Sequence, residues 1–426
     1  MYKSILKNKS FLGYWGSTTL MRLASNMLQF ALAIFVLDLT GSALIFSTVL
    51  SAIIFPRIIG TPIAGYLADY KDCLRILKLG ALGLTALMLS FFLIHTLITP
   101  LNISLIYVLV ICLELCETLI SASEMKAVIC IVDENQITAA SKLSSLDDGI
   151  VEILSPVIAG FAYGLFGIQA VLLATLVSEL VAFLLTLMLR DRAKNMTENP
   201  GVMNKQSLFH EAMTSYKEAI VSLQEYNYVL GVILFAPLFN FFVSPLFSVT
   251  VPHFIRITTK SSIEIYTAYN LALGIASVVA PFIAMWLIRD KAEHKANLRG
   301  TIIYAFLMLI LSFVTQSFSS IQPATLLSII AGAMVLAVII ITLMSIATTI
   351  TVKTSIPEQV LGRIASIIQL CAIVSTPLGQ LLYGYFADRF PIFLSFACSS
   401  LGLLATYVIM KKTYKKLKRE KQKNGY

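Results

Sequence analysis

Long apolar segments recur about every thirty residues along this chain of 426 residues, and they limit what it can fold into. Apolar residues make up 58% of the chain and charged residues only 13%, which is too little charge to cover a soluble surface of this size. A segment of about 18 or more mostly apolar residues can cross a bilayer as a helix. Such a segment is helical because its backbone hydrogen bonds must be satisfied internally in lipid. The sequence therefore predicts an all-α integral membrane protein.

Twelve segments of this kind can be placed along the chain. They begin near residues 11, 43, 76, 101, 145, 166, 228, 265, 299, 322, 362 and 390. The fifth begins inside the polar stretch 142–148, and the fourth has Glu114 and Glu117 at its centre.

Positive charge falls in alternate gaps between the apolar segments. All but five of the 32 Lys and Arg residues lie in the two termini and in the second, fourth, sixth, eighth and tenth gaps. Under the positive-inside rule, this asymmetry predicts an even number of spans with both termini in the cytoplasm. The formal charge of +9 is thus a signature of topology, and nucleic acid is not an expected partner. We expect a multi-pass protein of the bacterial cell (plasma) membrane, in contact with the lipid bilayer.

The chain divides into two halves that echo each other. We predict a six-helix bundle over 1–190, a cytoplasmic linker with an amphipathic helix over 191–226, a second bundle over 227–411 and a basic tail over 412–426. Pro62 corresponds to Pro281, and Pro156 to Pro377, at an offset of about 220 residues. Duplicated bundles of this kind place the solute site near the middle of the membrane, and one half rocks against the other.

Several motifs resemble those of the major facilitator superfamily. Residues 65–69, Gly-Tyr-Leu-Ala-Asp, resemble its Gly-x-Leu-Ala-Asp loop signature. Residues 39–43, 237–240 and 357–364 are similar to the macrolide-efflux-type exporters of that superfamily, and the resemblance covers essentially the whole chain. It implies the major facilitator fold, with twelve transmembrane helices in two six-helix pseudo-repeats, and a role in drug efflux and antibiotic resistance.

The loop signature implies a conformational latch, a charge contact that forms in one state of the transporter and breaks in the other. Its candidate residues are Gly65, Asp69, Lys71 and Arg75. The chain departs from the family pattern, because Tyr70 stands where a basic residue is usual and Cys73 where an arginine is usual. The alternative is that Asp69 only caps a helix.

Ionisable residues inside a membrane mark solute or proton paths. Those placed at depth are Arg22, Arg57, Glu114, Glu117, Glu152 and Glu179. The resemblance implies that the first and fourth helices line the cavity, so Arg22, Glu114 and Glu117 are the leading proton-coupling candidates. Two carboxylates at i, i+3 repel in a low dielectric, and a proton relieves them. Arg22 is expected to pair with whichever of the two is ionised; the alternative is a static Arg–Glu clamp.

Further candidates are weaker. Glu152 is a reserve proton-coupling candidate, but a structural role is favoured for both Glu152 and Glu179. Candidates for the substrate cavity are Asn26, Phe239 and Asn240, because ligand pockets combine apolar contact with a few polar groups.

The function favoured by the sequence is export of an amphipathic, drug-like small molecule by proton antiport. The alternatives are import or export of a siderophore, peptide or lysolipid on the same fold and, more remotely, a membrane-embedded enzyme. His95, His210, His253 and His294 lie on scattered segments without metal-ligand spacing. We therefore expect no metal, no cofactor and no catalytic residues. We also expect the protein to function as a monomer.

Overall fold

The structure is a computed structural model that describes Ile5 and residues 8–70, 72–132, 136–189, 227–287, 293–317, 321–355 and 358–423. Nearly all of these residues are helical, and the described part of the chain contains no strand. The prediction of an all-α protein is confirmed.

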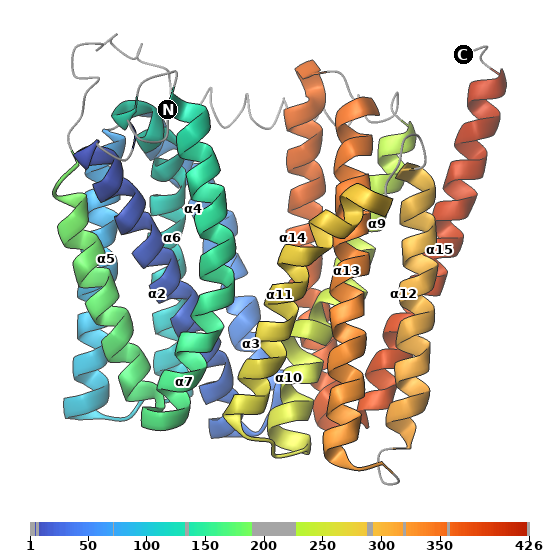
Figure 1. Ribbon diagram of the computed structural model, residues 1–426, viewed down its shortest axis with the longest axis horizontal. Coiled ribbons are helices and arrows are strands. Elements are labelled where there is room, and N and C mark those ends of the chain that lie inside the picture. Colours follow the sequence, from blue (N-terminus) through green and yellow to red (C-terminus); the bar gives the residue numbers. More distant parts are fainter. Residues whose placement is uncertain are drawn as a thin grey trace. The chain divides into compact units, whose positions relative to one another are not determined.

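The first compact unit comprises Met1–Gly41, Ala52–Gly201 and Ser261–Leu271. Its helices pack side by side, with α2 and α5 against α7, and α4 and α5 against α6 (Figure 1). They are α2 (Lys9–Thr40), α4 (Ile54–Tyr70), α5 (Cys73–Leu93) with its π-helical extension η1 (Ile94–Ile98), α6 (Ile103–Ile131) and α7 (Ile137–Thr186).

The second compact unit comprises Ser42–Ser51, Val202–Lys260 and Ala272–Tyr426. Within it, α12 packs on α13 and α15, and α9 packs on α14 and α15. Its elements are α3 (Ala43–Ala52), α9 (Asn227–Pro245), η3 (Leu246–Thr250), α10 (Val251–His253), η4 (Phe254–Thr258), most of α11 (Ile263–Leu287), α12 (Glu293–Gln316), α13 (Pro323–Ser355), α14 (Glu358–Arg389) and α15 (Ile392–Lys423).

The described helices give twelve membrane crossings when α3 and α4 count as one, α9 to η4 as one, and α7 as two. Gly167 divides α7, because its φ of 72° is left-handed and interrupts the helix there. Within the described residues, ten helices are long and apolar enough to span a membrane by length and composition alone. Residues 153–186 count there as a single span, and α14 is not among the ten. The fifth crossing begins at Ile137, about eight residues earlier than the sequence predicts.

The ends of α2 show how local sequence defines a helix. The Asn8 side chain accepts hydrogen bonds from the backbone N–H groups of Ser10 and Phe11, which otherwise lack helical partners. At the other end Gly41 has a φ of 63°, and its N–H donates to the Leu37 carbonyl. The first crossing therefore has defined limits at both membrane faces.

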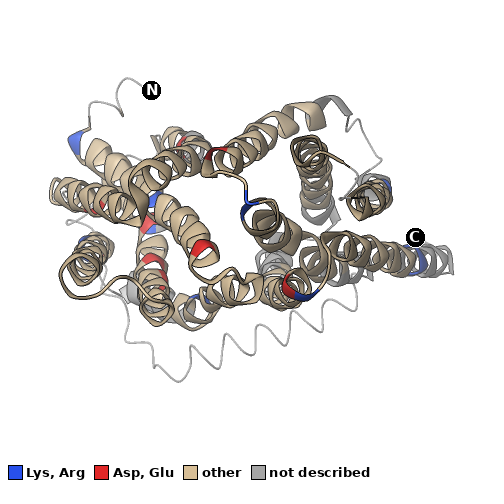
Figure 2. Ribbon diagram, turned by 90° about the horizontal axis from the view of Figure 1, so that it is seen from below, with Lys and Arg blue, Asp and Glu red and all other residues tan. Residues whose placement is uncertain are grey.

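Large apolar side chains on the outside of both units are exposed in the protein alone. Phe55 and Phe282 are each 70% exposed, and Phe313 is 66% exposed. Seen along the helix axes, most of the described ribbon is uncharged (Figure 2). A multi-pass membrane protein can expose such side chains because lipid covers much of its surface.

Glycine spacing explains one contact within the first unit. Gly160 and Gly164 lie four residues apart on α7, and they pack against Thr267 and Ile263 at the start of α11. A Cβ on either glycine would collide with these side chains. The small-residue pattern of the fifth span therefore serves close helix packing.

Candidate functional site

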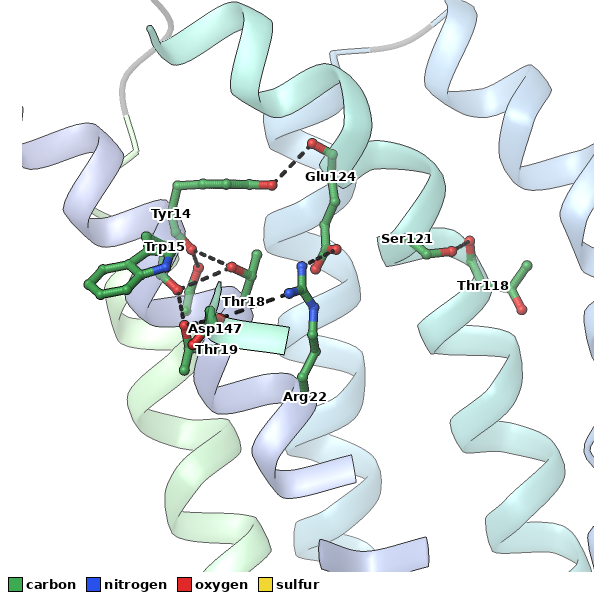
Figure 3. A network of polar contacts seen from close by, with 10 residues as sticks. Tyr14, Trp15, Thr18, Thr19, Arg22, Thr118, Ser121, Glu124 and Asp147 are labelled. Carbon is green, nitrogen blue, oxygen red and sulfur yellow. Dashed lines mark hydrogen bonds and ion pairs between the residues drawn. The ribbon is translucent and has the colours of Figure 1, made fainter. Parts of the chain in front are cut away.

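An ion-pair cluster inside the first unit joins Arg22 of α2, Glu124 of α6 and Asp147 of α7 (Figure 3). The Nη2 atom of Arg22 lies 3.0 Å from Oε2 of Glu124, and its Nη1 lies 3.9 Å from Oδ2 of Asp147. The Asp147 side chain is 6% exposed and that of Glu124 is 16% exposed. The planar guanidinium thus connects three helices through two carboxylates, a geometry that suits arginine better than lysine.

One face of α2 supplies the neighbouring polar groups. Thr19 donates to Oδ2 of Asp147 at 2.6 Å, and the Tyr14 hydroxyl donates to the backbone carbonyl of Glu124 at 3.2 Å. Residues 14, 18 and 22 follow one another at four-residue spacing, which places them along one side of a helix. Asp147 is thus held by the charge of Arg22 and by the hydroxyl of Thr19, and these contacts offset the cost of burying a carboxylate.

A second ion pair joins Arg57 of α4 to Glu114 of α6. The Nε atom of Arg57 donates to Oε1 of Glu114 at 2.6 Å, and Glu114 is buried while the Arg57 side chain is 48% exposed. Gly60 lies one turn from Arg57, and a Cβ there would sit 3.2 Å from the side chain of Thr118, one turn beyond Glu114. The glycine lets α4 approach α6 closely enough for the arginine to reach the carboxylate.

Two more carboxyl groups lie in the interior of the first unit. Glu117, one turn from Glu114, is half-buried and lies near Ser25 of α2. Glu179 of α7 is 1% exposed, and its Oε2 atom has no hydrogen-bond partner among the described residues. Burying a carboxyl group without such a partner costs free energy.

The expected pairing of Arg22 with Glu114 or Glu117 is wrong for Glu114. Its partner is Arg57, whereas Arg22 lies near Glu124, ten residues further along α6. The helix rises about 1.5 Å per residue, so the two arginines meet α6 at different depths. Sequence position alone does not reveal this, because it shows neither the tilt nor the register of the helices.

The substrate-cavity candidates lie in different settings. Asn26 is exposed, and Asn240 is half-buried with its amide bonded to the Ala236 carbonyl of its own helix at 2.9 Å. Phe239 packs against Phe235 and edge-on against Tyr304, with ring centroids 5.2 and 5.9 Å apart. The Phe239 ring therefore contributes to packing within the second unit.

The latch candidates lie largely outside the described side chains. Only the backbone of Gly65 and Asp69 is described, and Lys71 is outside the described residues. For Glu152, the reserve proton-coupling candidate, the structure likewise describes the backbone alone. Arg75 is exposed in the first turn of α5, where the carboxylate of Asp72 accepts from its backbone N–H at 3.2 Å.

Sequence reasoning missed Glu124 and Asp147. Both lie in polar stretches near the predicted ends of spans, where charge is usually solvated. Hydropathy gave no signal for Asp147, because the helix that carries it begins ten residues earlier, before the apolar part of the span.

Among the described side chains, no group of three or more His, Cys, Asp or Glu residues could hold a metal ion. The two ion pairs instead offer carboxylates next to arginines inside a helical bundle. A carboxylate of this kind can take up a proton and release its arginine, or exchange the arginine for a cationic solute group.

Twelve crossings with ionised groups among the helices define a multi-pass membrane transporter. A profile of the Major Facilitator Superfamily matches residues 14–379, and the chain belongs to this superfamily.

Solved structures support the same fold. A bacterial homologue of the iron transporter ferroportin, in an inward-facing state, is 14% identical with a TM-score of 0.67, over 96% of this chain and 98% of that one. A D-xylose–proton symporter is 12% identical with a TM-score of 0.67, over 96% and 97%. The POT family transporter PepTSo is 10% identical with a TM-score of 0.69, over 97% and 99%. A search of the curated proteins gave no match.

Proposed function

We propose that the protein is a secondary active transporter that exports an amphipathic, drug-like small molecule in exchange for protons. Membership of the superfamily supports transport of a small solute by alternating access. The resemblance of residues 39–43, 237–240 and 357–364 to macrolide-efflux-type exporters supports the direction and the class of substrate.

The observation that carries proton coupling is the buried Glu114 with Arg57 at 2.6 Å. With Glu114 ionised, the pair is neutral overall and both charges are satisfied. When a proton binds to Glu114, the arginine loses its counter-ion, and the pairing energy that favoured one arrangement of the helices is lost. Substrate and proton can then be bound in alternation, as antiport requires.

The experiment that tests this function has two stages. A panel of toxic compounds is compared in cells with and without the gene, which identifies substrates by reduced susceptibility. Inverted vesicles then report proton release when a substrate from the panel is added. Substrate-dependent proton movement supports antiport, whereas accumulation without it, or movement inward in cells, contradicts the proposal.

The Lys and Arg asymmetry predicts that the C-terminus is cytoplasmic. A reporter that is active only in the cytoplasm, fused after Lys412, should be active, and one that is active only outside should be silent. The opposite pattern would mean an odd number of crossings or an inverted orientation.

Asp69→Asn should strongly reduce transport while the protein stays folded in the membrane. The charge is proposed to act in only one of the two conformations, so its loss shifts their populations rather than the fold. Transport is measured in vesicles and folding by size-exclusion chromatography of the same preparation. Full transport by the variant would exclude the latch, and joint loss of fold and transport would favour a helix cap.

A further inference from the structure

One short sequence occurs twice in this chain. Residues 65–69 are Gly-Tyr-Leu-Ala-Asp and residues 384–388 are Gly-Tyr-Phe-Ala-Asp. The first copy ends the second crossing, on the membrane face where the chain begins. The second copy ends the eleventh crossing, one crossing before the C-terminal helix α15 returns to the starting face. Each membrane face therefore carries one copy.

The glycine of the second copy is a point of close helix contact in the second unit. A Cβ on Gly384 of α14 would collide with the Ser47 hydroxyl and would sit 2.8 Å from the Ala43 carbonyl of α3. The absence of a side chain at this position is what lets α14 touch the first turn of α3.

The aspartate of the second copy holds the N-terminus of α3. The Asp388 carboxylate accepts from the Ala43 N–H at 2.6 Å, from the Leu44 N–H at 3.1 Å and from the Ser42 hydroxyl at 2.6 Å. Helix α3 has no acidic residue in its own first turn. A carboxylate from another helix therefore binds the N–H groups left free by helix geometry, where the helix dipole also favours negative charge.

A histidine from a third element joins this contact. Nε2 of His253 lies 3.8 Å from Oδ1 of Asp388, and His253 is 8% exposed. The Asp388 side chain keeps 21% of its surface exposed. Water can therefore take over the hydrogen bonds when the contact opens, so the contact can form and break in each cycle.

We propose that Asp388 is a second charge latch, which holds the second crossing to the eleventh at the face opposite the termini while that face is closed. Residues 42–51 belong to the second unit, but the chain continues from them into the first unit at Ala52. Release of the α3 N-terminus from Asp388 would free this segment to move with the helix that follows it. The proposal rests on alternating access from the proposed function, and it makes Asp388 the counterpart of Asp69.

Hydrogen–deuterium exchange on the full-length protein in nanodiscs tests the proposal without any substrate. Asp388→Asn should raise the exchange rate of peptide 42–48 about tenfold, because one charge-assisted contact is lost. It should also slow exchange at 66–75 on the other face, because that face closes as the first one opens. Asp69→Asn should do the reverse at both places. If exchange rises at 42–48 alone, Asp388 is only a helix cap and the proposal is overturned.

Two further variants keep the test decisive. Gly384→Ala retains the carboxylate but forces α3 and α14 apart, so it should reproduce both changes even where Asp388→Asn folds poorly. Asp38→Asn removes another carboxylate, one that accepts from the Tyr163 hydroxyl within the first unit, and should leave 42–48 unchanged. If hydrogen exchange changes in opposite directions at 42–48 and 66–75 but export is not linked to protons, the latch is sustained and the proposed function is refuted. If export is linked to protons but the two exchange rates do not change together, the proposed function is sustained and the latch is refuted.

Discussion

Glu114→Gln is expected to abolish proton-driven accumulation of substrate in inverted vesicles, while downhill exchange of substrate continues. Glutamine keeps the size of the side chain and can still accept a hydrogen bond from Arg57, but it cannot bind and release a proton. The coupling by which proton binding changes the affinity for substrate, typically about 5- to 150-fold, is then lost. The measurement is substrate uptake with and without an imposed pH gradient.

Controls separate this role from a static clamp between α4 and α6. If Glu114 only clamps Arg57, Glu114→Gln leaves an unpaired guanidinium and lowers the melting temperature, and Arg57→Gln in the same protein restores it. If Glu114 carries the proton, the double variant stays uncoupled. Glu117→Gln is the matched change one turn away on the same helix. A stable Glu114→Gln protein that still concentrates substrate against a gradient would transfer the role to Glu117.

The fold was largely predictable because lipid imposes a simple rule on sequence. Each crossing needs a long apolar helix, so hydropathy and charge asymmetry are enough to find most spans. The boundaries failed where a helix extends beyond its apolar part. Helix α7 continues through the polar stretch 142–148, where Asp147 forms an ion pair with Arg22 and accepts a hydrogen bond from Thr19 inside the bundle. Average hydropathy cannot see such internal pairing.

The candidate site was predictable in its residue types but not in its pairings. Buried charges in the first half stood out from the sequence, and Glu114 is indeed buried. Which arginine faces which carboxylate depends on helix tilt and on close approaches such as that of Gly60 to Thr118. The contact of Asp388 with α3 is a further case, since it joins residues 345 positions apart and follows from neither hydropathy nor periodicity.

Arg22→Gln should cause the largest loss of stability among the variants considered. It leaves Glu124 and Asp147 as neighbouring carboxylates without their shared cation, and breaking a buried pair from one side costs about 3–5 kcal/mol. The Arg22 side chain is 29% exposed, so solvent screening places the effect at the low end of that range. Thermal melting in detergent measures the loss. The control is Arg299→Gln, which removes an exposed arginine and should melt like the wild type.

Two variants test whether the stability of the cluster comes from its charges rather than from side-chain volume. Arg22→Lys retains the charge but not the planar fork that reaches two carboxylates, so it should recover only part of the stability. Adding Asp147→Asn and Glu124→Gln to Arg22→Gln removes the unpaired charges and should raise the melting temperature above that of Arg22→Gln alone. If the triple variant is less stable than the single one, the cluster is held by packing and by the Thr19 and Tyr14 hydroxyls instead of by its ion pairs. The cluster would then have no part in charge balance within the bundle, and proton coupling would rest on the Arg57–Glu114 pair alone.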